Sequence, residues 1–157
     1  MLKNIVLIGP SGIGKSTIGK YISNEMNNFR NIDTDELIER KTKMSIQDIF
    51  NSYGEPYFRH IEKSIGKSIQ YEKNCVIATG GGIIKDTENI RYLKKNGVLF
   101  LLYGSKETII RNLNNSTNTR PLIDNSVDME KAVEKLLLER EKLYFNYTDF
   151  VIYVDNK

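Results

Sequence analysis

The sequence carries a phosphate-binding motif near its N-terminus, of the form G-x-x-x-x-G-K-[ST], spelled Gly9-Pro10-Ser11-Gly12-Ile13-Gly14-Lys15-Ser16-Thr17. Glycines reach backbone angles closed to other residues, so successive N–H groups of such a loop can turn toward an anion. Lys15 adds a positive charge near the β- and γ-phosphates, and the Ser16 hydroxyl can bind Mg²⁺. The motif predicts binding of ATP or GTP. The nucleotide-contacting residues it predicts are Gly12, Ile13, Gly14, Lys15, Ser16 and Thr17.

Two carboxylates one residue apart, Asp33 and Asp35, are the next candidates for chemistry. One of them can hold Mg²⁺, directly or through water, and the other can accept a proton from an attacking hydroxyl. The alternative is that the segment only begins a helix, with Thr34 or Asp35 as its N-cap. The two interpretations are compatible, because one carboxylate can serve both purposes.

Arginines beside carboxylates suggest a site for an acidic substrate. Arg59 and Glu62 lie three residues apart, on one face of a predicted helix. An arginine held by Glu62 could bind a substrate carboxylate with its planar fork. The alternative is a surface ion pair, worth only ~0.2–0.5 kcal/mol. Arg140, which stands between two glutamates, has the same two interpretations.

The elements that must position these residues alternate between strands and helices. Apolar runs predict strands over residues 5–8, 31–33, 75–79, 98–103 and 149–154, and helical spacing predicts helices over 17–26, 55–72, 86–96, 105–114 and 128–147. Such alternation predicts a parallel sheet covered by helices on both faces. Ligands of these sheets bind at the carboxyl ends of the strands. The phosphate loop, the two aspartates and the run Gly80-Gly81-Gly82 should therefore converge on one cleft.

Some helix ends can be read from single residues. Ser45 begins a capping box, and Gly54 should end the short helix that follows it. Pro56 suits the first turn of the next helix. Gly97 is expected to be the C′ glycine that ends the helix over 86–96.

Composition limits the class of protein. The chain has 157 residues, 23 basic against 20 acidic residues and a net charge of +3. This charge is too small and too evenly spread to indicate a nucleic-acid partner. A single cysteine, Cys75, cannot form an internal disulfide, and no run approaches the ~20 apolar residues of a membrane helix. We expect a single-domain cytoplasmic protein that binds neither nucleic acid nor membranes.

A polar stretch, residues 114–121, has no apolar periodicity and includes Arg120. It is either a plain surface loop or a lid that closes over a bound nucleotide.

Taken in order, these motifs resemble the shikimate kinase family along nearly the whole chain. The phosphate loop is shared with many kinases, whereas the block over 46–62 followed by three glycines is far more specific. The matching motifs are Asp33-Thr34-Asp35, Ile46-x-x-Ile49-Phe50-x-x-x-Gly54-Glu55-x-x-Phe58-Arg59-x-x-Glu62, Thr79-Gly80-Gly81-Gly82, Arg120-Pro121-Leu122-Ile123 and Glu139-Arg140-x-x-x-Tyr144.

The resemblance implies transfer of the γ-phosphate of ATP to the 3-hydroxyl of shikimate, with Mg²⁺, on the way to chorismate and the aromatic amino acids. It implies a three-layer α/β sandwich with a five-stranded parallel sheet, of the nucleoside monophosphate kinase-like P-loop fold. One domain should span residues 1–157, with a substrate-binding segment at about 33–62 and a lid at about 114–124. We expect a monomer.

The resemblance also implies residue roles on the nucleotide side. Lys15 would stabilise the transferring phosphoryl group, while Ser16 ligates Mg²⁺ and Asp33 supports the metal. Arg120, on the lid, would reach the ATP phosphates, and Arg111 would lie against adenine.

On the acceptor side, Asp35 would bind the shikimate hydroxyls and act as the base. Arg59 and Arg140 would clamp the carboxylate, with Glu62 orienting Arg59. The remaining residues would line the pocket: Gly80, Gly81 and Gly82 by close backbone approach, Phe50 and Phe58 as an apolar wall.

The sequence departs from the family pattern at Thr148, where an alanine is usual, and at Ile123, where leucine is commoner. Two other interpretations remain at this point. One is a related kinase for gluconate or a nucleoside monophosphate. Such kinases share the phosphate loop, the lid and the sheet, but not the block that this chain has over 46–62. The other is a nucleotide-binding module without catalytic activity.

Overall fold

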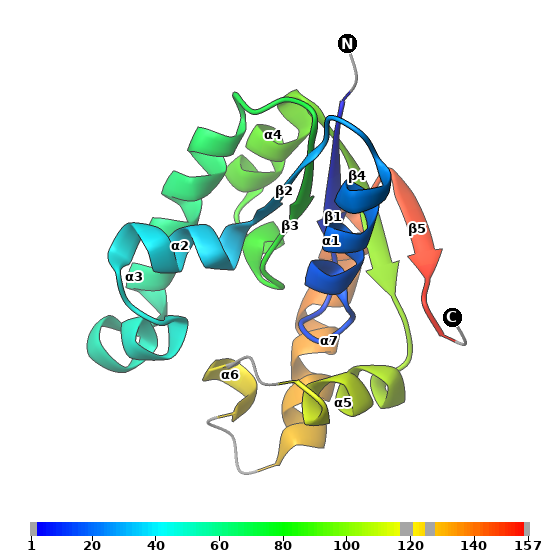
Figure 1. Cartoon of the computed structure of the whole chain (residues 1–157). Coiled ribbons are helices and arrows are strands. Elements are labelled where there is room, and N and C mark those ends of the chain that lie inside the picture. The colour runs from blue at the N-terminus through cyan, green and yellow to red at the C-terminus, as the bar shows by residue number, and fades with distance from the viewer. Residues whose placement is uncertain (1–2, 117–120, 125–127, 156–157) are drawn as a thin grey trace.

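One parallel sheet organises the molecule in the computed structural model, which describes residues 3–116, 121–124 and 128–155. Five strands lie in the order β2-β3-β1-β4-β5, and every neighbouring pair is parallel (Figure 1). Their bounds are β1 Asn4–Ile8, β2 Arg30–Asp33, β3 Cys75–Ala78, β4 Gly97–Tyr103 and β5 Phe150–Tyr153. The predicted five-stranded parallel sheet is thus confirmed, each strand within about two residues of its expected position.

Helices cover both faces of this sheet. They are α1 Lys15–Glu25, α2 Thr34–Thr42, α3 Ile46–Ile69, the 3-10 helix η1 Ile83–Lys85, α4 Thr87–Lys95, α5 Lys106–Asn114, α6 Pro121–Asp124 and α7 Met129–Tyr147. Figure 1 shows α1 in front of the sheet and α7 behind it. This arrangement is the predicted three-layer sandwich.

The alternation of side chains along β1 explains the three layers. Val6 and Ile8 belong to a core cluster shared with α3 and α4, whereas Leu7 belongs to a second cluster shared with α1 and α5. All three side chains are buried. A strand buried on both faces needs a continuous apolar run, which is the pattern that predicted it.

The helix ends agree with the sequence in part. Ser45 caps α3 by accepting a hydrogen bond from the Asp48 amide at 3.0 Å. Gly54, with φ 81° and ψ 173°, interrupts α3 as expected. Gly97 directly follows Asn96, the C-cap residue of α4, as predicted, but it lacks the left-handed φ of a C′ glycine and is the first residue of β4. A Cβ at Gly97 would lie 2.5 Å from the Leu93 carbonyl oxygen, so close packing is the reason for glycine there.

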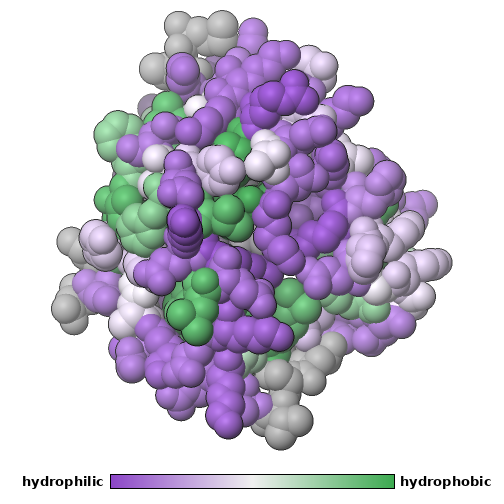
Figure 2. Space-filling view, turned by 180° about the vertical axis from the view of Figure 1, so that it is seen from behind, coloured by the Kyte–Doolittle hydropathy of each residue, from purple (hydrophilic) through white to green (hydrophobic). Residues whose placement is uncertain are grey.

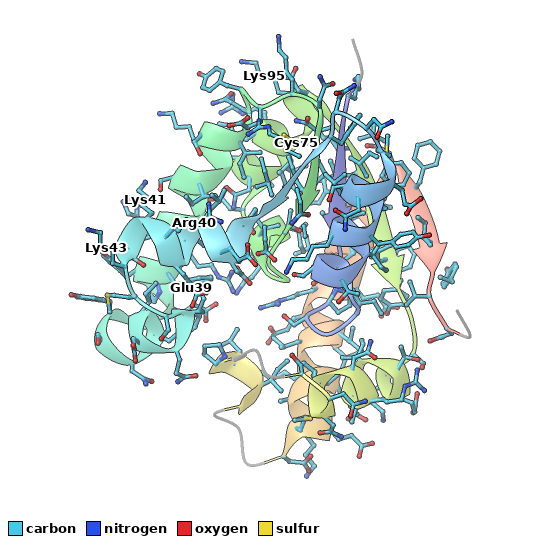
Figure 3. All side chains as sticks on the ribbon, viewed as in Figure 1. Glu39, Arg40, Lys41, Lys43, Cys75 and Lys95 are labelled. Atoms are coloured by element: carbon cyan, nitrogen blue, oxygen red, sulfur yellow. The ribbon has the colours of Figure 1, made fainter. Side chains whose placement is uncertain are left out.

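The side of the molecule seen in Figure 2 is largely polar, with separate apolar areas. The four residues of the edge strand β5 are all exposed. Cys75 is fully buried at the start of β3, at the opposite end of this strand from the glycine run (Figure 3). Within the described part of the chain, no helix is long and apolar enough to cross a membrane.

Candidate active site

The phosphate loop joins β1 to α1 and opens onto a pocket at the carboxyl end of the sheet. Gly12 and Gly14 have φ values of 87° and 108°, which residues with a Cβ rarely adopt. The loop's backbone can therefore curl around an anion at the positive end of α1. Helix α1 begins at Lys15, two residues earlier than the sequence predicts.

Lys15 is buried against its own loop. Its Nζ donates hydrogen bonds to the carbonyl oxygens of Gly9 at 2.5 Å and Pro10 at 2.8 Å. Only 7% of the residue is exposed, so its charge is directed into the loop and shielded from bulk solvent. A charge in such a position interacts strongly with a bound phosphate.

Asp33 connects the phosphate loop to α2. Its Oδ2 accepts a hydrogen bond from the Ser16 hydroxyl at 2.6 Å, and its Oδ1 accepts from the amides of Asp35 and Glu36 at 3.0 and 3.2 Å. The N-cap of α2 is therefore Asp33, which corrects the expectation of Thr34 or Asp35. The earlier start of the helix places its cap on the last residue of β2.

The pair Ser16 and Asp33 also fits a magnesium ion. A hydroxyl and a carboxylate side by side offer hard oxygen ligands, and Mg²⁺ commonly takes one or two such ligands together with substrate phosphates. Among the described residues no group of three or more His, Cys, Asp or Glu could form a metal cage. A magnesium site here would therefore depend on the nucleotide for its remaining ligands.

The three glycines after β3 leave room for functional side chains. A Cβ would lie 2.9 Å from Asp35 Oδ1 if placed on Gly80, and 2.8 Å from Ser11 Oγ if placed on Gly81. On Gly82 it would lie 2.5 Å from Arg59 Nη2. The glycine run therefore forms a wall against which a carboxylate, a hydroxyl and a guanidinium all rest.

Arg59 is held by two glutamates on its own helix. Its Nη1 donates to Glu62 Oε1 at 2.9 Å, while Nε and Nη2 both donate to Glu55 Oε2 at 3.2 and 3.1 Å. Glu62 is 1% exposed, and burial raises the pKa of its carboxyl group, an effect that Arg59 and Arg140 oppose. The Arg59–Glu62 pair is thus a partly buried contact that lines a pocket, which distinguishes it from a surface ion pair.

Arg140 projects from α7 into the same region. It is 4% exposed, and its Nε and Nη2 have no hydrogen-bond partner among the described residues. Burying a guanidinium with unused donors is costly unless a ligand satisfies them. Arg140 is therefore ready to bind an anion.

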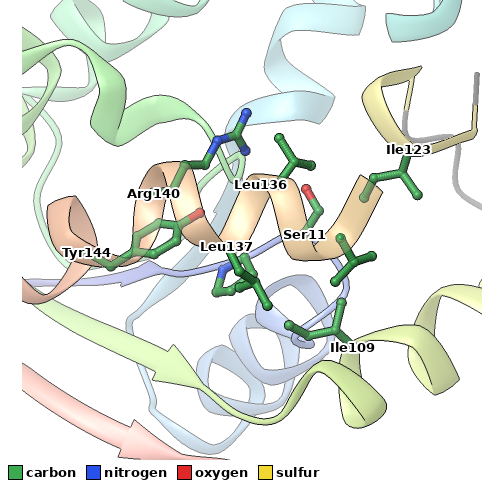
Figure 4. Close-up of a pocket in the computed structure, with 9 residues that line it drawn as sticks. Ser11, Ile109, Ile123, Leu136, Leu137, Arg140 and Tyr144 are labelled. Atoms are coloured by element: carbon green, nitrogen blue, oxygen red, sulfur yellow. The ribbon is translucent and has the colours of Figure 1, made fainter. Parts of the chain in front are cut away.

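Tyr144, one turn after Arg140, fixes α7 to the glycine wall. Its hydroxyl donates to the Gly81 carbonyl oxygen at 2.5 Å. Burial raises the pKa of Tyr144 to about 12, so the hydroxyl keeps its proton and remains a donor. Figure 4 shows Arg140 and Tyr144 beside an apolar pocket lined by Ser11, Ile109, Ile123, Leu136 and Leu137.

Two larger pockets meet at this wall. The first contains the phosphate loop, Asp33, Thr79 and part of α5, and the second contains Phe50, Phe58, Arg59, Glu62, Gly82 and Arg140. Both are lined by the same four residues, namely Ser11, Asp35, Gly80 and Gly81. A nucleotide in the first pocket and an acceptor in the second would face each other across Asp35.

Most of the expected site residues are brought together. Gly12, Gly14, Lys15, Ser16, Thr17 and Asp33 line the nucleotide pocket, while Ile13 is buried in the core behind it. Arg111 instead lies on the exposed side of α5, beside a neighbouring hollow. Arg120 and residues 117–119 of the expected lid lie outside the described residues, so their roles stay predictions.

Two contacts in the site carry no clear sequence signal. Asn112 Nδ2 donates to the Gly12 carbonyl oxygen at 2.7 Å, which ties α5 to the phosphate loop. Thr34 Oγ1 accepts from the Gly80 amide at 2.9 Å and so ties α2 to the glycine wall. Glu55, by contrast, could have been identified from its spacing of four residues from Arg59 on one helix.

A parallel sheet with a phosphate loop, and beside it a pocket with two arginines and a carboxylate, defines a P-loop kinase that acts on a small acidic molecule. Comparison with known proteins gives the family. The family model for shikimate kinase matches residues 11–157, and the chain belongs to the shikimate kinase family. It is accordingly a phosphotransferase that uses ATP to phosphorylate shikimate.

The similarity to individual members extends over nearly the whole chain. The shikimate kinase of Caldanaerobacter subterraneus subsp. tengcongensis is 44% identical over 156 residues, covering 99% of this chain and 89% of that protein. The shikimate kinase of Thermoanaerobacter pseudethanolicus is 42% identical over 157 residues, covering 99% and 88%. Among solved structures, shikimate kinase from Acinetobacter baumannii in complex with shikimate matches with a TM-score of 0.93 at 33% identity, covering 100% of this chain and 86% of that one.

Proposed function

We propose that the phosphoryl group passes from ATP to the 3-hydroxyl of shikimate at the place where the two pockets meet. The observation that carries this proposal is the wall they share, formed by Ser11, Asp35, Gly80 and Gly81. In-line transfer needs donor and acceptor oxygens close together on opposite sides of the phosphorus. Two adjoining pockets with one carboxylate between them supply that arrangement.

On the nucleotide side, we assign phosphate binding to the loop amides of residues 12–17 and to the ammonium group of Lys15. Ser16 and Asp33 would hold Mg²⁺, which neutralises charge on the β- and γ-phosphates when bound. The 2.6 Å hydrogen bond between these two side chains supports the assignment, because it already places both oxygen ligands side by side. Arg111 is proposed to contact the adenine side from α5.

On the acceptor side, we assign the carboxylate of shikimate to Arg140 and Arg59. The unused donors of Arg140 support its part, and Glu62 orients Arg59 through the 2.9 Å bond to Nη1. Asp35 positions the hydroxyl and accepts its proton as the oxygen attacks the γ-phosphorus. The bond from the γ-phosphorus to the β,γ-bridging oxygen breaks, and ADP leaves with that oxygen.

The lid and the setting of the enzyme complete the proposal. Residues 114–124 would close over the nucleotide and bring Arg120 to the transferring phosphoryl group. Excluding water in this way suppresses hydrolysis of ATP. We further propose a single domain over residues 1–157, acting as a cytoplasmic monomer without a nucleic-acid or membrane partner.

The first test is ADP release from ATP and Mg²⁺, with and without shikimate, coupled to NADH oxidation. We expect turnover to depend on shikimate and to fall by about 10²-fold or more in Lys15→Ala, because the positive charge that stabilises the transferring phosphoryl group is lost. A panel with gluconate and nucleoside monophosphates serves as the control for acceptor identity. Folded protein that binds ATP but releases no ADP with shikimate would overturn the proposal.

A further inference from the structure

No role has been assigned to Glu55, yet it accepts hydrogen bonds from Arg59, which is proposed to bind the substrate carboxylate. We propose that Glu55 is a positioning residue that competes with the acceptor carboxylate for Arg59 and moves to Lys85 when the acceptor binds. The proposal rests on the proposed function, because it takes Arg59 as a ligand of the shikimate carboxylate.

Arg59 holds Glu55 with one edge of its guanidinium group. Its Nε and Nη2 donate to one oxygen of Glu55, at 3.2 and 3.1 Å. This edge of the guanidinium can bind a carboxylate with two parallel hydrogen bonds. Nη1 is taken by Glu62, and Gly82 lies against the two terminal nitrogens. A bidentate contact with the acceptor at this edge therefore requires Glu55 to move.

The two glutamates differ in their freedom to move. The Glu62 side chain is 1% exposed, whereas that of Glu55 is 33% exposed and follows Gly54, where α3 is interrupted. The buried carboxylate of Glu62 is fixed by its surroundings, but the partly exposed carboxylate of Glu55 can rotate toward solvent. Glu55 is thus the exchangeable partner of Arg59, and Glu62 is the permanent one.

Glu55 has a second cationic neighbour, Lys85. Lys85 Nζ lies 3.5 Å from Glu55 Oε2, and both residues line a groove that also reaches Arg140. Lys85 is 44% exposed, so it can follow the carboxylate as it turns away from Arg59. Glu55 is therefore already paired with Lys85, and strengthening this pair as Arg59 is released lowers the cost of the release.

The charges around Arg59 explain why the acceptor carboxylate would replace Glu55 and would not bind as a third carboxylate beside it. Arg59 already faces two carboxylates, and a third would meet repulsion in a partly buried site. Arg140 has unused donors, so it can receive the acceptor carboxylate first. The acceptor then replaces Glu55 on Arg59, and the observed affinity includes the cost of that replacement.

The test measures KM for shikimate in Glu55→Gln and Lys85→Met. We expect Glu55→Gln to lower KM by roughly three- to tenfold, because the competing charge is gone, and Lys85→Met to raise it by a similar factor. In the double variant the Lys85 effect should vanish, and kcat should stay within about twofold throughout. Lys63→Met is the matched control. Lys63 lies on the same helix as Glu55, but it pairs with Asp86 and Glu88, at 3.2 and 3.5 Å, and not with Glu55.

A merely structural role for Glu55 predicts the opposite sign. If Glu55 only orients Arg59, Glu55→Gln raises KM and Lys85→Met leaves it unchanged, and either result overturns the proposal. The methyl ester of shikimate, used as a competitor, has no charge to exchange, so its inhibition constant should be the same in all variants. An equal change for ester and acid would also overturn it. Turnover of shikimate by the unmodified protein tests the proposed function separately.

Discussion

Asp35 lies where both pockets meet, and this position separates its role from that of its neighbour Asp33. Asp33 is engaged by Ser16 and by two backbone amides, so its oxygens are fixed at the nucleotide side. Asp35 lines both the nucleotide and the acceptor pocket. In the proposed function, Asp33 would therefore serve the metal and Asp35 the acceptor.

This division predicts the effect of Asp35→Asn. Turnover should fall by about 10²–10⁴-fold, because an amide cannot accept the hydroxyl proton, while the dissociation constant for ATP changes little. Glu36→Gln is the matched control, since Glu36 is next along α2 and its side chain pairs with the exposed Lys20 and Arg40 at 3.9 Å. Steady-state kinetics and calorimetry with ATP provide both quantities. Near-normal turnover in Asp35→Asn would exclude Asp35 as the proton acceptor.

Gly82 offers a second prediction for a single residue. Its φ of −103° suits alanine, so Gly82→Ala should fold with little change in melting temperature. The new Cβ would stand 2.5 Å from Arg59 Nη2 and displace the guanidinium. We expect a rise of roughly tenfold in KM for shikimate with unchanged ATP binding. A variant with normal KM would show that Arg59 adapts without cost.

Among the elements, α3 owes its shape to one residue. Gly54 bends the helix so that Phe50 before the break and Phe58 after it meet with ring centroids 4.9 Å apart. Both rings line the acceptor pocket together with Arg59. A continuous helix would separate them, so the break is part of the site.

Gly54→Ala should therefore affect both folding and the acceptor pocket. A φ of 81° with ψ of 173° is almost confined to glycine, and alanine there costs about 1–3 kcal/mol. Urea unfolding should show this loss, and KM for shikimate should rise while KM for ATP does not. Ser52→Ala, at an exposed helical position two residues earlier, is the control. Equal stability of the two variants would contradict this account of the break.

The strands and long helices could be predicted because their signals are local. The apolar runs of β1 and β3, and the capping residue of α3, determine those elements by themselves. The start of α2 and the role of Gly97 depend on tertiary contacts, which a sequence pattern does not contain. The short elements η1 and α6 have too few residues for any periodicity.

The candidate site shows the same limit. The phosphate loop could be identified from residue type and spacing alone, whereas spacing left Arg59 and Arg140 as either substrate ligands or members of surface ion pairs. Which side of α5 faces the nucleotide pocket could not, because that depends on how Asn112 meets the carbonyl oxygen of Gly12. The departure at Thr148 is explained by structure as well, since its hydroxyl proton can be donated to the carbonyl oxygen of Phe150 at 2.7 Å or to that of Leu99 at 3.2 Å.

The stability of the whole molecule should respond to alkaline pH through Tyr144. Its pKa is raised by burial from 10.0 to about 12. Below pH 10 the phenol is protonated in both states. Between these two values the unfolded chain ionises first, so the free energy of unfolding falls as pH rises, by up to roughly 3 kcal/mol from this group.

In Tyr144→Phe the free energy of unfolding should fall less steeply between pH 10 and about 12 than in the unmodified protein, whatever the stability of the variant at neutral pH. The measurement is urea unfolding at several pH values from 8 to about 12, compared with Tyr21→Phe, whose phenol is exposed. Parallel curves for Tyr144→Phe and the unmodified protein would contradict the assignment.

The wall shared by the two pockets also bears on inhibition. A single compound spanning both pockets would gain from both binding sites without a second loss of translational freedom. Such a compound would rest on Gly80, where any larger side chain meets Asp35 at 2.9 Å. A substitution at Gly80 that weakened binding of the compound would also displace Asp35, the proposed base. Resistance would have to arise at the periphery of the pockets, where each change removes only a fraction of the binding.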